Sequence, residues 1–155
     1  MTAQRSITSC SIVAGIGSWQ GEDQVGWRIV RHLKTLPGLC IKSLALKEPT
    51  ELISHLDHCQ SLIVVDACLS GNSPGTVIEM SWPDQRLKLL RADTSHNFGV
   101  NSTLQLAQNL EILPKQITIY GIEVEHFDYG REIGPAVELA MKSLVHQIAQ
   151  EVSCA

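Results

Sequence analysis

A run of aliphatic residues near the middle of the chain, Leu62-Ile63-Val64-Val65, places the strongest constraint on the fold. A strand with one face in solvent alternates apolar and polar side chains, so a continuous run predicts a strand covered on both faces. Such runs alternate along this chain with segments in which apolar residues recur at helical spacing. That alternation is typical of an α/β domain in which helices cover both faces of a mostly parallel sheet.

The same reading assigns the remaining elements. Apolar runs predict strands at 12–16, 39–46, 61–67, 76–82 and 116–122, and helical spacing predicts helices at 23–34, 50–59, 100–110 and 135–149. We expect 76–82 to form an edge strand and the mostly polar segment 83–94 to form a loop. The predicted fold is a three-layer α/β/α sandwich of the phosphorylase/hydrolase-like kind, with a twisted, mostly parallel (mixed) five-stranded sheet.

Composition excludes several classes of protein. A length of 155 residues fits one domain, 1–155. The formal charge of -4 and the lack of any basic cluster argue against nucleic-acid binding. No stretch approaches the roughly 20 apolar residues that cross a bilayer, and the first residues contain no apolar signal core, so we expect a cytoplasmic protein away from membranes. The five cysteines are odd in number and widely spaced, which predicts reduced thiols without disulfides.

The carboxyl ends of the predicted strands are where sites form in open α/β sheets. The loop after the first strand contains Gly15 and Gly17, but Gln20 stands where a dinucleotide-binding fingerprint needs its third glycine. Glu22 and Asp23 follow, and their charges would compete with a pyrophosphate for the positive end of the next helix. The alternative interpretation of these two acids is that they cap that helix.

Two further loops carry candidate ligands. Asp66 directly follows the aliphatic run, and His96 lies just before the helix predicted to begin at Val100. Taken singly, Asp66 could cap a turn and His96 could hydrogen-bond a helix entrance. Together with Asp23 they form a mixed oxygen and nitrogen ligand set that suits a divalent transition-metal ion and leaves positions open for water or substrate.

A competing metal site is conceivable on the helix predicted for 50–59. His55 and Cys59 are four residues apart, and His58 is three from His55, which is compatible with zinc. Apolar residues on the other side of the same helix favour a simpler interpretation, in which His55, Asp57 and His58 form its solvated face.

Four sequence blocks, in this order and with this spacing, resemble the hydrogenase maturation endopeptidases, which process the large subunit of nickel-iron hydrogenases. The first block is similar to the family's opening glycines and acidic pair, although Ser18 stands where the family usually has Asn. The others are similar to its second acidic block, its S-H-x-x-G block and its late G-I-E block. The four are Gly15-Ile16-Gly17 with Glu22-Asp23-Gln24-Val25-Gly26, 62–71 with Asp66, Ser95-His96-Asn97-Phe98-Gly99, and Gly121-Ile122-Glu123.

The resemblance implies a function and a site. It implies an endopeptidase that removes the C-terminal extension of the large-subunit precursor after nickel insertion, with Asp23, Asp66 and His96 as metal ligands and catalytic residues. The nickel would be supplied by the precursor, and another divalent ion could take its place. The expected partner is that precursor, bound by a monomer. Two alternatives remain: a nucleotide-binding or small-molecule-binding α/β module, and a metal-binding assembly factor that cleaves nothing.

Overall fold

A computed structural model describes residues 10–90, 99–125 and 132–153 of the chain. Strands β1 (Cys10–Ile16), β2 (Ile41–Leu46), β3 (Cys59–Cys68), β4 (Val77–Ser81) and β5 (Gln116–Glu123) form one sheet in the order β2-β1-β3-β5-β4. The first four in that order run parallel, and β4 pairs antiparallel to β5 at the edge. The mixed five-stranded sheet and the edge position of the fourth strand are both confirmed.

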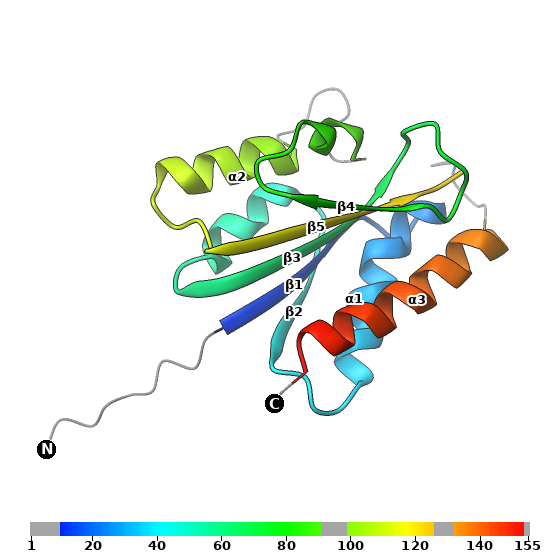
Figure 1. Cartoon of the computed structure of the whole chain (residues 1–155), viewed down its shortest axis with the longest axis horizontal. Coiled ribbons are helices and arrows are strands. Elements are labelled where there is room, and N and C mark those ends of the chain that lie inside the picture. Colours follow the sequence, from blue (N-terminus) through cyan, green and yellow to red (C-terminus); the bar gives the residue numbers. More distant parts are fainter. Residues whose placement is uncertain (1–9, 91–98, 126–131, 154–155) are drawn as a thin grey trace, which may run out of the picture.

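Helices lie on both faces of this sheet (Figure 1). Helices α1 (Val25–Thr35) and α3 (Pro135–Glu151) cover one face and contact each other. Helix α2 (Val100–Asn109) covers the other face together with the 3₁₀ turns η2 (Pro49–His55) and η3 (Gln85–Leu89). The predicted three-layer α/β/α sandwich is therefore the fold observed. No helix in the described part of the chain is both long and apolar enough to cross a membrane.

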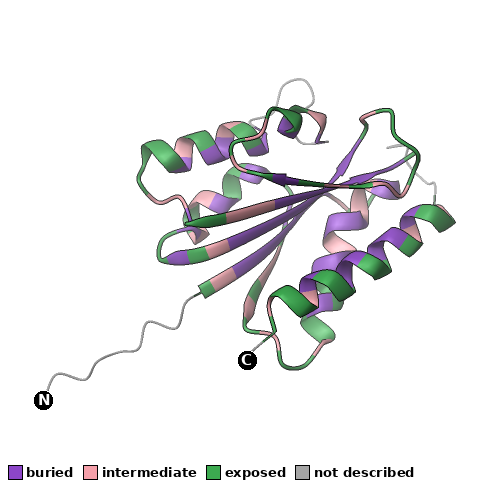
Figure 2. Cartoon of the chain, in the orientation of Figure 1, coloured by how far each residue is buried: buried purple, intermediate pink, exposed green. Residues whose placement is uncertain are grey.

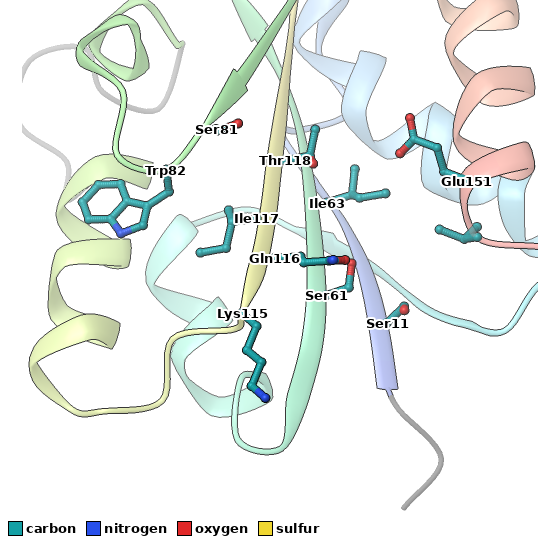
Figure 3. Close-up of a pocket in the computed structure, with 11 residues that line it drawn as sticks. Ser11, Ser61, Ile63, Ser81, Trp82, Lys115, Gln116, Ile117, Thr118 and Glu151 are labelled. Carbon is teal, nitrogen blue, oxygen red and sulfur yellow. The ribbon is translucent and has the colours of Figure 1, made fainter.

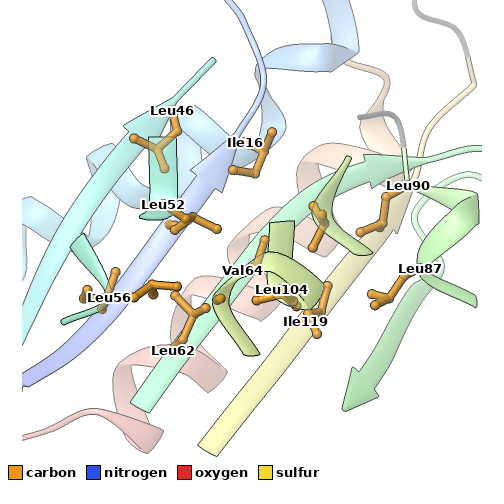
Figure 4. Close-up of a cluster of buried hydrophobic side chains, with 14 of the residues drawn as sticks. Ile16, Leu46, Leu52, Leu56, Leu62, Val64, Leu87, Leu90, Leu104 and Ile119 are labelled. Atoms are coloured by element: carbon orange, nitrogen blue, oxygen red, sulfur yellow. The ribbon is translucent and has the colours of Figure 1, made fainter. Parts of the chain in front are cut away.

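The packing of β3 on both of its faces explains why its sequence is apolar without interruption. Leu62 and Val64 pack into the core under α2, whereas Ile63 and Val65 pack into the core under α1 and α3. Successive side chains of a strand point to opposite faces, so two helical layers need two apolar sets. The burial of the strand centres is visible in Figure 2, and the core on the α2 side in Figure 4.

Three local predictions are wrong. The first helix begins at Val25, after a separate 3₁₀ turn η1 (Gly21–Gln24). The helix predicted for 50–59 is a 3₁₀ turn that ends at His55, because His58 adopts a positive φ of 63° and the chain then enters β3. The segment expected to be a polar loop contains η3, and Leu87 within η3 and Leu90 directly after it are completely buried in the core on the α2 side.

The cysteines also depart from the prediction. Cys10, Cys59 and Cys68 are free, but Cys40 is disulfide-bonded. Its backbone lies beside the end of α3: the Cys40 N–H donates to the Val152 carbonyl at 3.3 Å, and Leu39 pairs with Ser153. Positions more than 100 residues apart along the chain meet there, and the spacing of cysteines in a sequence carries no signal of such a contact.

Candidate active site at the carboxyl ends of the strands

Three loops meet at one edge of the sheet because β1, β3 and β5 are parallel neighbours. These loops follow Ile16, Cys68 and Glu123, the last residues of the three strands. Helix α1 starts against the same edge: a Cβ on Gly26 would lie 2.7 Å from the carbonyl oxygens of both Ile16 and Val65. Only glycine permits that approach, so the first loop is held directly against the ends of β1 and β3.

Asp23 lies at this edge, half-buried, in a loop that closes on itself. The Ser18 hydroxyl donates to Asp23 Oδ2 at 2.7 Å, and the Ser18 N–H donates to the Asp23 carbonyl at 3.2 Å. Gly17 lies so close that an added Cβ would be 2.1 Å from the same carbonyl oxygen. Asp23 is therefore fixed through its backbone and through its carboxylate.

Asp66 lies at the same edge, in β3, and is fully buried. Its Oδ1 accepts the Ala67 N–H at 2.8 Å. Asp66 is two and four residues beyond Val64 and Leu62, so the period of two places it on the face of the sheet that α2 covers. Its register partner in β5 is Gly121, and the space where a Cβ of Gly121 would lie is bordered by the side chains of Cys68 and Leu90, each 3.2 Å away.

His96, the third predicted ligand, lies outside the described residues. Helix α2, which begins at Val100, covers the face that carries Asp66. The structure thus brings Asp23 and Asp66 to one edge, and the three-residue ligand set remains a prediction.

Glu123 is a buried carboxylate at this edge whose role the sequence did not reveal. It accepts hydrogen bonds from the Ser70 N–H, the Ser70 hydroxyl at 2.6 Å, the Gly71 N–H at 3.0 Å and the Cys68 thiol at 3.4 Å. Burial alone would raise the pKa of Glu123, but these hydrogen bonds outweigh it and hold the pKa below its usual value. Glu123 therefore fixes the loop that follows Asp66.

The Cys68 thiol is not a nucleophile in this setting. Burial, the hydrogen bond to Glu123 and the charges of Glu123 and Asp66 raise its pKa to about 12. A thiol with such a pKa stays protonated at neutral pH, and the thiolate is the reactive form. Cys68 contributes a hydrogen bond to the loop rather than covalent catalysis.

Glu22 connects the first loop to the third. Its side chain is buried, and its Oε1 accepts the Glu125 N–H at 2.8 Å across 103 residues of sequence. Helix α1 has Gln24 as its N-cap, with no side-chain cap hydrogen bond. The interpretation of Glu22 as a cap of that helix is therefore wrong, because its carboxylate supports the exit of β5 instead.

Nucleotide binding finds no support in the first loop. The space beside Gly17, where a pyrophosphate would need close approach to the backbone, is filled by the carbonyl of Asp23. The buried Glu22 carboxylate lies in η1, the turn directly before α1. Both features disfavour an anion at the start of α1.

The competing metal cluster does not assemble. Cys59 belongs to β3, and its thiol donates to the Ser61 carbonyl at 3.1 Å. His55 Nδ1 lies 3.0 Å from Lys42 Nζ, and His58 Nε2 lies 3.5 Å from Asp57 Oδ2 on the surface. Within residues 10–90, 99–125 and 132–153, no group of three His, Cys, Asp or Glu side chains is placed to hold a metal ion.

A cavity of about 580 Å³ lies at the opposite, amino end of the sheet (Figure 3). Its polar lining comes from neighbouring strands: Ser11 is the register partner of Ser61, Ser61 that of Gln116, and Thr118 that of Ser81. Among its described lining residues, neither Asp23 nor Asp66 occurs. The candidate site and this cavity are thus at different ends of the same strands.

Comparison with known proteins agrees with this architecture. Residues 47–151 match the family model described as hydrogenase maturation protease. The hydrogenase expression/formation protein HupD of Rhodobacter capsulatus is 31% identical over 133 residues, which cover 81% of this chain; the match spans 63% of the length of that relative.

Solved structures share the fold over nearly the whole chain. The hydrogenase maturating endopeptidase HybD of E. coli has a TM-score of 0.74 at 25% identity, covering 91% of this chain and 90% of its own. The [NiFe] hydrogenase maturation protease HybD of Thermococcus kodakarensis has a TM-score of 0.75 at 23% identity, covering 92% and 99%. With a family model matched over more than half its length and a relative above 30% identity, this chain belongs to the hydrogenase maturation protease family.

Proposed function

We propose that the chain is an endopeptidase that removes the C-terminal extension of a nickel-iron hydrogenase large-subunit precursor after nickel insertion. The family match supports the reaction class. The observation that supports the site is the position of two carboxylates, Asp23 and the fully buried Asp66, at the carboxyl edge of the sheet. Carboxyl ends of parallel strands are where binding sites form in open α/β sheets, so the position of these two acids supports a binding role.

We propose that Asp23, Asp66 and His96 complete the coordination of the nickel that the precursor carries. Carboxylate and imidazole donors suit a divalent transition-metal ion. The nickel belongs to the substrate, so binding to it would restrict cleavage to precursor into which nickel has already been inserted. Water is the proposed nucleophile, because the Cys68 thiol is held protonated. The products are a shortened large subunit and a released peptide.

The partner and the working form of the protein belong to the same proposal. The whole chain would act as one domain and as a monomer in the cytoplasm, with the precursor's C-terminal region as its partner. Size-exclusion chromatography with light scattering, without and with precursor, checks the monomer and the 1:1 complex.

The test uses nickel-loaded and nickel-free precursor, followed by intact mass. We expect the wild type to shorten only the nickel-loaded precursor. Asp66→Asn keeps the side-chain shape and an acceptor for the Ala67 N–H but removes the charge, and His96→Ala removes a ligand; each should lower cleavage by at least about 100-fold. Circular dichroism and thermal melting should show that both variants remain folded.

His55→Ala is the matched control, because His55 lies on the surface beside Lys42, away from the carboxyl edge. It should cleave as the wild type does. Equal cleavage of nickel-free precursor would refute nickel recognition, and full activity of His96→Ala would refute the ligand set. Binding of the precursor without shortening would favour the assembly factor, and tight nucleotide binding in calorimetry would favour the nucleotide-binding module.

A further inference from the structure

Ser18 makes the shortest side-chain contact in the loop that carries Asp23. Its hydroxyl donates to Asp23 Oδ2 at 2.7 Å and accepts the Gln20 N–H at 3.3 Å. The same loop is closed by the Ser18 N–H donating to the Asp23 carbonyl, and by the Asp23 N–H donating to the Gln20 carbonyl at 3.0 Å. Ser18 thus contacts Asp23 twice across a six-residue loop, through its backbone N–H and through its hydroxyl.

The hydroxyl is not required to hold the loop itself. The two backbone hydrogen bonds and the close contact of Gly17 with Asp23 already define the path of the chain. Glu22 attaches the loop separately to the exit of β5. What the hydroxyl adds is the orientation of the Asp23 carboxylate, which is otherwise free to rotate about its side-chain bonds.

We propose that Ser18 is the positioning residue for Asp23, and that it holds Oδ2 so that Oδ1 is presented to the nickel of the precursor. This inference rests on the proposed function, since it assumes that Asp23 is a ligand. Partners that orient a ligand typically change metal affinity or activity by about 10–100-fold when they are removed. The Ser18 hydroxyl would therefore determine how strongly Asp23 binds the nickel of the precursor.

The experiment compares wild type, Ser18→Ala and Ser18→Thr. On nickel-loaded precursor, Ser18→Ala should lower kcat/KM by about 10–100-fold, and Ser18→Thr, which keeps the hydroxyl, should recover most of it. Ser54→Ala is the matched control, because its hydroxyl donates to the Glu51 carbonyl within its own exposed turn; it should behave as the wild type.

Affinity for nickel-free precursor separates positioning from a general loosening of the loop. Ser18→Ala should bind nickel-free precursor within twofold of the wild type, because that complex offers Asp23 no ion. Unchanged kcat/KM, or an equal loss of affinity for nickel-free precursor, would overturn the proposal.

Failure of the proposed function gives a different result. If the wild type cleaves neither precursor, the affinities for both forms can be measured directly. A preference for the nickel-loaded form that Ser18→Ala reduces about 10–100-fold would support the positioning role without proteolysis. Absence of any such preference in the wild type would overturn the role of Ser18 along with the recognition of nickel.

Discussion

The two ends of the sheet differ in how deeply their polar side chains are buried. At the carboxyl end, Glu22, Asp66 and Glu123 are buried, and each accepts a backbone N–H. At the amino end, polar side chains such as Lys115 and Gln116 remain exposed around an open cavity. Burial of a carboxylate costs free energy unless hydrogen-bond donors are placed to meet it, whereas a hydrated polar side chain loses little free energy. The comparison indicates that this fold concentrates its costly polar groups where the proposed chemistry lies.

The largest effect on the fold is expected from the contact that holds α1 against the carboxyl end. Gly15→Ala places a Cβ 2.1 Å from the Gly26 carbonyl oxygen, so strand and helix must separate. We expect a loss of about 3 kcal/mol in the free energy of unfolding, measured by urea titration.

Gly134→Ala is the control for that substitution, since a Cβ at Gly134 would meet no atom within 4 Å. It should cost less than about 1 kcal/mol. Similar losses of unfolding free energy in the two variants would show that the close approach of α1 to β1 does not stabilise the carboxyl end of the sheet.

A smaller effect is expected where Glu123 holds the loop after Asp66. Glu123→Gln replaces an acceptor of several hydrogen bonds with a group that turns an N–H toward buried donors, at a cost of about 2 kcal/mol at pH 7. Because the pKa of Glu123 is lowered in the fold, its stabilisation is complete above the unfolded pKa of about 4.3 and disappears as the pH falls through the folded pKa.

The wild type should therefore lose stability on acidification more steeply than Glu123→Gln, in urea titrations between pH 7 and pH 3. The exposed Glu79 of β4 supplies the control, Glu79→Gln, which should retain the wild-type slope. Parallel pH profiles for wild type and Glu123→Gln would show that the carboxylate does not support the loop as a charged group.

The smallest effect is expected at the amino end. Ser61→Ala and Thr118→Val alter the lining of the cavity without touching the carboxyl end. Each should change the free energy of unfolding by no more than about 0.5 kcal/mol and leave precursor cleavage unchanged. A loss of cleavage in either folded variant would mean that the cavity takes part in substrate binding, and the contrast between the two ends would fail.

Local sequence was sufficient to predict the layers of the fold. The aliphatic run at Leu62-Ile63-Val64-Val65 predicts a doubly covered strand, because each successive side chain has to enter a different core. The prediction of a loop was wrong over 83–90, because Leu87, Leu89 and Leu90 form an apolar group too short to show a helical period, so their burial depends on the sheet beneath them.

The positions of Asp23 and Asp66 at the carboxyl edge were predictable, because both follow or end predicted strands, while their role as ligands stays a prediction. The supporting contacts were not predictable. Glu22 reaches Glu125 across 103 residues, and Glu123 reaches Ser70 across 53, so neither pair leaves a periodic or local pattern. The hydrogen bond from Ser18 to Asp23 spans five residues, but it depends on a loop closure that the sequence does not display.

The order of the strands has a consequence for biosynthesis. β3 and β4 follow one another along the chain, yet β5 lies between them in the sheet, so β4 has no native partner until β5 has left the ribosome. The same late segment carries Glu123, without which the loop after Asp66 lacks its support. Nascent chains that end before residue 116 therefore contain both acidic residues of the proposed site but cannot assemble this edge. The proposed site would therefore form only after nearly the whole sheet has been synthesised.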